Sequence, residues 1–262
     1  MKRILYLILF LFPFRAYTQH QVPKISHAEP VYFDLVRDLG ARKGEKELNL
    51  GAGFYSDQGK YSSAYLVEYE FAPVNRLGVE VEIPFSFSRM SPGDDEKNAS
   101  RIKGIEAFKV ATQYSFLVAP KAQITMAIGY MLESERKASD LMHCDGFVHT
   151  PFLVIAKKWG NYFHTMIYSG PQLECARSGR QQNTLLVNSS VHWVIPGSRN
   201  FVGMELNQEV TSHATYSTFR PQVKLFLSST SALGIAIGIP VSNGGQNMDV
   251  LFRWIYEPQN KK

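Results

Sequence analysis

The chain has 262 residues, with 28 Lys and Arg against 23 Asp and Glu, which gives a formal net charge of +5. Apolar residues make up 45% of the sequence, an ordinary share for a folded protein that argues against intrinsic disorder. The two cysteines are too few for a disulfide-dense scaffold or a four-cysteine zinc site.

Residues 1–18 have the composition of a secretory signal peptide. Lys2 and Arg3 precede the apolar run 4–14, and small residues lead to a predicted cut after Thr18. The apolar run is about 16 Å long as a helix, too short for a bilayer core of roughly 30 Å. Cleavage leaves a net charge of +2 and no cluster of basic residues. We therefore expect no nucleic-acid partner.

The segment from residue 27 to residue 47 does not alternate between apolar and polar residues. Pro30 is placed to begin a short helix that Gly40 ends, with Val31, Leu35 and Leu39 near one face. Two arrangements remain open for this segment. It folds into the barrel described below as a partial plug, or it is a solvated periplasmic tail. Basic residues that would pair with lumen glutamates in a plug are Arg37, Arg42 and Lys43.

From about residue 45 to the end, apolar and polar residues alternate, as in strands with two different faces. The run 77–87 shows this most clearly, whereas apolar residues occupy both faces near residues 147–170. We predict about twelve strands, near residues 46–56, 61–73, 76–88, 103–116, 121–131, 147–158, 161–170, 183–195, 200–210, 217–228, 232–241 and 247–257.

The predicted connections between strands are alternately short and long along the chain. Those after the even-numbered strands are short, whereas long polar ones follow the third, fifth and seventh strands, for example at residues 90–101 and 133–146. Short turns on one rim and longer loops on the other are typical of outer-membrane barrels. We therefore divide the chain into a signal peptide (1–18), a periplasmic N-terminal segment (19–44), an antiparallel transmembrane β-barrel (45–258) and a polar tail (259–262).

Three features predict that the apolar face points to lipid. Most strands are long enough to cross a bilayer with tilt. The other face carries Gly and charged residues, which would make a poor dry core. Trp159, Trp193 and Trp254 lie near strand ends that share one rim, as in an interfacial aromatic belt. The predicted lumen lining is Glu68, Glu70, Glu80, Glu82, Glu106, Lys109, Arg220, Lys224, Asp249 and Arg253.

The string from His27 to Glu47, HAEPVYFDLVRDLGARKGEKE, resembles the beginning of a family of secreted proteins from Bacteroidota. The stretches VEYEFAP at residues 67–73 and RLGVE at 76–80 match the same pattern. The resemblance implies a barrel in a Gram-negative outer membrane, but it provides no catalytic or binding residues to transfer. In architecture the chain is also similar to small channel barrels for hydrophobic compounds.

Candidates for chemistry are few. Cys144 and Cys175 fall in predicted loops on one rim and could form a disulfide, with two free thiols as the alternative. Their neighbours include His143 and Glu174, but the spacing matches no known metal site. The histidines show no lipase-type spacing, and no nucleotide-binding or hydrolase motif occurs. We predict no catalytic residues, no metal and no cofactor.

The sequence thus predicts a passive outer-membrane channel, or a transport-related barrel, for small solutes. Outer-membrane lipid is the expected surrounding, and the oligomeric state stays open. Alternatives are a closed barrel with a structural or surface-interaction role, a lipid-modifying outer-membrane enzyme and a soluble secreted β protein.

Overall fold

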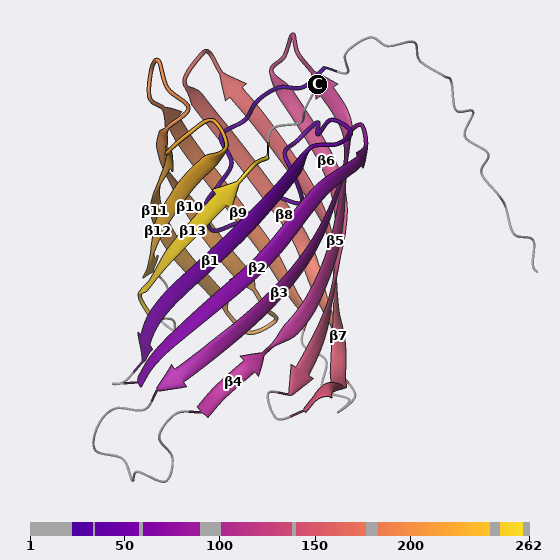
Figure 1. The fold of residues 1–262 in the computed structure, drawn as a ribbon, viewed down its shortest axis with the longest axis vertical. Coiled ribbons are helices and arrows are strands. Elements are labelled where there is room, and N and C mark those ends of the chain that lie inside the picture. Colours follow the sequence, from indigo (N-terminus) through magenta and orange to yellow (C-terminus); the bar gives the residue numbers. More distant parts are fainter. Residues whose placement is uncertain are drawn as a thin grey trace, which may run out of the picture.

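The computed structural model describes residues 23–33, 35–57, 60–89, 101–137, 140–176, 183–241 and 247–258. Antiparallel strands form one sheet that curves into a barrel (Figure 1). The strands are β1 (Lys46–Asp57), β2 (Lys60–Val74), β3 (Leu77–Arg89), β4 (Arg101–Ile105), β5 (Ala107–Ala119), β6 (Ile124–Lys137), β7 (Asp140–Trp159), β8 (Phe163–Ala176), β9 (Asn183–Val194), β10 (Phe201–Val210), β11 (Thr215–Phe226), β12 (Ser231–Pro240) and β13 (Asp249–Tyr256).

The sheet closes because its first and last strands pair, with Leu48 of β1 opposite Tyr256 of β13. Strands β4 and β5 both pair with β3 and are separated by Glu106 alone, whose N–H donates to the carbonyl of Pro84. With β4 and β5 counted as one interrupted strand, the described residues form a closed ring of twelve. The predicted antiparallel all-β barrel is confirmed. No helix in the described ranges is long and apolar enough to cross a membrane.

The two rims of the barrel differ. Short turns join β2 to β3, β5 to β6, β7 to β8, β9 to β10 and β11 to β12 on one rim, at the top in Figure 1, which we call the turn rim. This rim also carries the start of β1 and the end of β13. Gly160, in the turn between β7 and β8, has a φ of 60°, a left-handed conformation that favours glycine. We call the opposite end the loop rim.

The outer and inner faces have opposite chemistry. In β2, Val67 and Tyr69 are exposed outward, whereas Glu68 and Glu70 are buried. Similarly, Phe252 and Trp254 of β13 are exposed around the buried Arg253. A water-soluble barrel fills its interior with apolar side chains. This barrel instead has an apolar exterior around a polar interior, as in membrane barrels.

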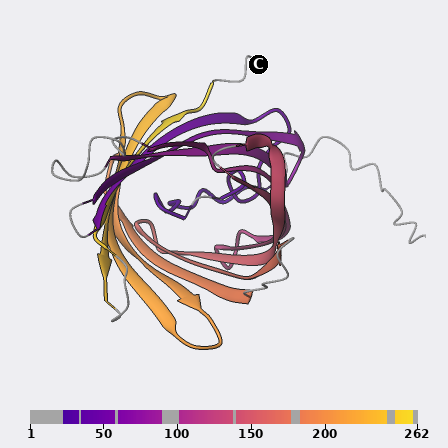
Figure 2. The ribbon, with the colours of Figure 1, turned by 90° about the horizontal axis from the view of Figure 1, so that it is seen from below.

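The described part of residues 23–44 (residues 23–33 and 35–44), which we call the inner segment, lies inside the ring and at its turn rim (Figure 2). They form bends and turns, so the described residues contain no helix between Pro30 and Gly40. Val31, Leu35 and Leu39 are nevertheless all buried, as the predicted helical face required. The three residues that the prediction grouped together are thus buried together, while the backbone takes an irregular path. The segment can take this path because side chains of the barrel wall accept hydrogen bonds from its backbone.

The inner segment also explains the weakly alternating stretch near residues 147–170. Leu35, Val36 and Leu39 pack in one apolar cluster against inward side chains of β5 to β8. The inner face of those strands is apolar because it contacts the segment rather than water. The wall residues of this cluster are Ala111, Ala127, Phe152, Val154, Ala156, Met166 and Tyr168.

Gly78 of β3 allows the closest approach between the segment and the wall. A Cβ atom added there would lie 1.9 Å from the carbonyl oxygen of Val36, which is backbone and cannot rotate away. We expect Gly78→Ala to displace the segment and to expose Arg37 to trypsin in the detergent-solubilised barrel. Gly53→Ala is the matched control, since a Cβ at Gly53 meets only the Ala64 carbonyl at 3.8 Å. Equal cleavage of both variants would contradict the packing.

Candidate functional site

Side chains of the barrel wall accept hydrogen bonds from backbone N–H groups of the inner segment. The N–H of Ala28 donates to His164 Nδ1 at 2.8 Å, and the N–H of Val31 donates to Gln222 Oε1. The two oxygens of Glu205 accept from the N–H groups of Tyr32 and Phe33. Buried backbone groups need partners, and the internal bonds of this irregular segment, from Arg37 N–H to Leu35 and from Ala41 N–H to Asp38, supply only some of them. The wall bonds thus replace the hydrogen bonds that a helix would have made.

Arg37 forms the centre of an ionic cluster that holds the segment. Its guanidinium bonds to Glu47 and to Asp38, and its Nη1 lies 3.4 Å from Glu70. Burial alone would lower the pKa of Arg37, but the surrounding carboxylates outweigh it and raise the pKa. Arg37 also has a φ of 74°, uncommon for a residue other than glycine. Such strain persists where the surroundings over-determine the conformation.

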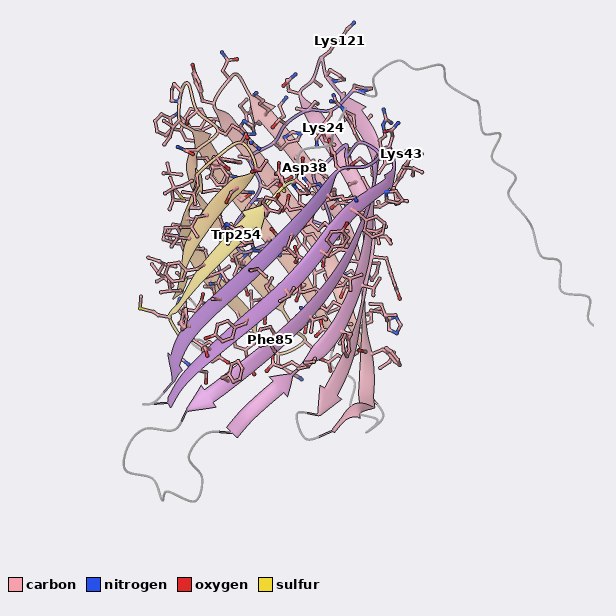
Figure 3. All side chains as sticks on the ribbon, viewed as in Figure 1. Lys24, Asp38, Lys43, Phe85, Lys121 and Trp254 are labelled. Atoms are coloured by element: carbon pink, nitrogen blue, oxygen red, sulfur yellow. The ribbon has the colours of Figure 1, made fainter. Side chains whose placement is uncertain are left out.

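A second cation supports the same cluster from the turn rim. The ammonium of Lys24 lies 2.6 Å from Asp38 and 2.8 Å from Glu45, and Figure 3 shows Lys24 beside Asp38. Burial opposes ionisation of Asp38, yet Arg37 and Lys24 hold its pKa well below the usual range. The segment is therefore held by charge at its centre as well as by apolar packing.

The three basic residues predicted for a plug have different positions. Only Arg37 is buried and contacts one of the predicted glutamates, Glu70. Arg42 and Lys43 are exposed at the turn rim, where their backbone N–H groups bond to Glu45 and Asn75. Among the described ion pairs, none includes the side chain of Arg42 or Lys43.

The inner segment divides the lumen into two cavities. The larger, of about 640 Å³, has Tyr32, Phe33, Leu35 and Val36 among its lining residues. The smaller, of about 280 Å³, lies at the turn rim and is lined by residues 24–29, among others. The two cavities have no lining residue in common. Residues of the inner segment thus line both cavities.

Most of the predicted lumen residues line the larger cavity. Lys224 instead lines the smaller one, Glu70 is buried beside Arg37, and Glu106 is exposed and accepts from Ser86 Oγ at the break between β4 and β5. Arg220 pairs with Asp249 and lies 3.6 Å above the ring of Tyr32. The members that line the larger cavity are Glu68, Glu80, Glu82, Lys109, Arg220, Asp249 and Arg253.

Sequence reasoning missed the residues that bind the segment's backbone. Alternation places Glu205 and Gln222 on the polar face, so their inward direction was available from the sequence. Nothing local indicates that they meet Tyr32 or Val31, which lie more than 170 positions away along the chain. His192, whose Nε2 lies 3.1 Å from Gln222, belongs to the same wall.

The predicted tryptophans and cysteines lie on strands. Trp159, Trp193 and Trp254 are exposed at the turn-rim ends of β7, β9 and β13, and Figure 3 shows Trp254 on the outer surface. Cys144 and Cys175 belong to β7 and β8 and not to loops, because β6 to β8 extend further than predicted. Cys175 is exposed. The side chain of Cys144 lies outside the described residues, so the disulfide stays a prediction.

A protein-family profile described as HAEPLYID-like matches residues 23–257. No curated protein matches the chain significantly. An outer membrane channel from Pseudomonas putida F1 has a similar structure, with a TM-score of 0.63 and 12% identity over 84% of this chain and 98% of that chain. The KdgM porin, also solved with disordered oligogalacturonate, gives a TM-score of 0.55 and 12% identity over 80% and 98%. At such identity the likeness shows the fold alone.

The Arg37 cluster gives a direct test of what holds the segment. Arg37→Met leaves the buried carboxylates Glu47 and Glu70 without their cation, which typically costs about 3–5 kcal/mol for a buried pair. We expect faster amide hydrogen exchange across residues 24–41 in this variant. Arg42→Met is the control, since Arg42 is exposed, and it should exchange like the parent. Unchanged exchange in Arg37→Met would show that the ion pairs do not hold the segment.

Docking of the segment should also depend on pH through His27. Its Nε2 lies 2.9 Å from Thr125 Oγ1, and burial, assisted by His164 and Lys158, lowers its pKa to about 4. A released segment would titrate near the ordinary histidine value of about 6.5. Acidification from about pH 6.5 to 4 therefore protonates the released form first and weakens docking. The bond from Ala28 to His164 Nδ1 equally requires an unprotonated ring nitrogen.

The expected result is faster hydrogen exchange in the segment at pH 5 than at pH 7.5, after correction for the intrinsic pH dependence. His27→Gln should show a smaller difference between the two pH values. His213→Gln is the control, because His213 is exposed between β10 and β11 at the loop rim. The same pH difference in all three proteins would exclude His27 as a cause.

Proposed function

The chain belongs to the HAEPLYID-like family, and from that premise and its fold we propose that it is a plugged outer-membrane channel for small solutes. A signal peptide at residues 1–18 would direct it there, in a Gram-negative bacterium. The observation that carries the proposal is the polar lumen inside an apolar exterior, divided by the inner segment into two cavities. Passive transport then requires that the segment move.

In this proposal the turn rim faces the periplasm and the loop rim faces outward, as is usual for outer-membrane barrels. The inner segment then enters from the periplasmic side. The exposed Trp159, Trp193 and Trp254 at the turn rim would lie at the inner lipid interface, where indole rings favour the boundary between headgroups and hydrocarbon. The predicted residues lining the lumen would tune selectivity through charge and width.

The charges of the larger cavity favour cationic or neutral solutes. Six carboxylates line it against three basic side chains, counted over the described residues. Low-dielectric walls focus such a charge excess and raise the local concentration of the opposite sign. An anionic oligosaccharide such as the oligogalacturonate of the KdgM complex would be repelled. The carboxylates are Glu68, Glu80, Glu82, Glu133, Glu209 and Asp249, and the bases are Lys109, Arg220 and Arg253.

A closed barrel with a structural or surface-interaction role is the second candidate. The separation of the two cavities favours it, because a segment that never moves would make the barrel impermeable. The two candidates differ in whether the segment can be displaced under conditions that leave the barrel intact.

Deletion of residues 27–43, with the signal peptide kept, tests the channel. We expect the purified variant to form larger and more frequent conductance steps in planar bilayers than the parent, because the two cavities would join. Under a KCl gradient its reversal potential should show a preference for K⁺. Unchanged conductance would reject the plug. A parent chain that inserts well but stays silent, beside a deletion variant that conducts, would support the closed barrel.

A further inference from the structure

Three carboxylates meet on the inner face of β2 and β3. Glu68 lies directly opposite Glu82 in the register of the two strands, and Glu70 lies opposite Glu80. Oxygen atoms of Glu68, Glu80 and Glu82 all lie within 4.8 Å of one another. Like charges directly across a strand pair are destabilising, so the wall needs something to compensate for this arrangement.

The neighbouring cations compensate for only part of this charge. Arg253 lies 3.8 Å from Glu68, and Lys109 lies 3.1 Å from Glu82 and 3.8 Å from Glu133. The four carboxylates and two cations therefore have a local net charge of −2 when all are ionised. A single divalent cation matches that charge.

Glu80 is the member without a direct hydrogen bond or ion pair among the described residues, although the charge of Lys109 acts on it from a greater distance. It is only 5% exposed, and within the described residues no hydrogen bond or ion pair reaches its carboxylate. It nevertheless lines the larger cavity, so a solute can approach it. A buried carboxylate without a partner is costly, and the cavity is the side from which a partner can come.

A second buried oxygen nearby also lacks a partner. Gln113 of β5 is 2% exposed, and its Nε2 donates to the carbonyl of Arg37 at 2.9 Å, which fixes the orientation of the amide. Its Oε1 accepts no hydrogen bond. Gln113 lies opposite Gly78, diagonal to Glu80, and lines the same cavity. Gln113 Oε1 can accept a hydrogen bond but cannot donate one, and the same holds for the neighbouring carboxylates when they are ionised. A group of such oxygens favours a cation as its partner.

We propose that Glu68, Glu80 and Glu82, with Gln113 Oε1, bind a hard divalent cation of the Ca²⁺ class from the larger cavity. Such ions take carboxylate and amide oxygens at about 2.3–2.6 Å, so ligand oxygens around one ion lie within roughly 5 Å of one another. The carboxylates have that spacing, and the inference goes beyond the channel function. The bound ion would neutralise the wall and join β2 to β3 beneath the inner segment.

Calcium titration of the full mature chain, folded in detergent and freed of metal by a chelator, tests the site by calorimetry. We expect one site with a dissociation constant of about 10⁻⁴–10⁻³ M, the range of extracellular calcium modules. Glu80→Gln should weaken binding at least tenfold. Glu209→Gln is the matched control, a carboxylate of the same cavity on β10, and should bind within twofold of the parent.

Absence of calcium binding by the parent at pH 7.5 would overturn the proposal and leave shared protons to compensate for the carboxylates. Equal affinity in Glu80→Gln and Glu209→Gln would overturn it as well. A heat-modifiable gel shift establishes that each variant is folded, and Glu82→Gln replaces Glu80→Gln if the latter fails that check. The readout is binding and not conductance, so failure here and failure of the channel proposal are distinguishable.

Discussion

The pairing of β1 with β13 is the constraint on which the rest of the structure depends. It closes the sheet into a ring, so that the backbone groups of the ring bond within the sheet. A closed antiparallel sheet is one of only two backbone arrangements that lipid tolerates. Once the ring is closed, the outer face can be apolar, because the backbone groups of the ring are already paired within the sheet. The polar side chains of the inner face must then find hydrogen-bond and ionic partners inside the lumen.

The inner segment supplies many of the hydrogen-bond partners that the polar side chains of the lumen need. His164, Gln222 and Glu205 would point into an unfilled lumen without it, and with it they accept hydrogen bonds from backbone N–H groups. The segment in turn needs those acceptors, because its irregular path leaves the N–H groups of residues 28 and 31–33 to bond to the wall. Wall and segment thus depend on each other, with Arg37 at their ionic centre. A contact made of such polar bonds can be broken and re-formed, as a movable plug requires.

Much of the barrel was predictable because period-two patterning is local. The predicted strand at residues 183–195 and the observed β9 at Asn183–Val194 differ by a single residue. Boundaries failed where charged residues continue a strand beyond the apolar stretch. The predicted loop at residues 133–146 is mostly strand, since β6 runs to Lys137 and β7 begins at Asp140. That extension also moves Cys144 out of a loop.

The sequence by itself predicted the antiparallel all-β barrel and, for most strands, which residues face inward, because side-chain alternation follows from strand geometry alone. It also grouped Val31, Leu35 and Leu39 on one face, but it assigned them to a helix. Only the tertiary structure decided that the inner segment lies within the lumen in an irregular conformation, and that Arg37 rather than Arg42 or Lys43 is buried there. These outcomes depend on hydrogen bonds and ion pairs with strands far away in the chain, which no local pattern encodes. The net charge of +5 gave no indication of the acidic lumen, because the arrangement of charges around a cavity depends on the register of the closed sheet.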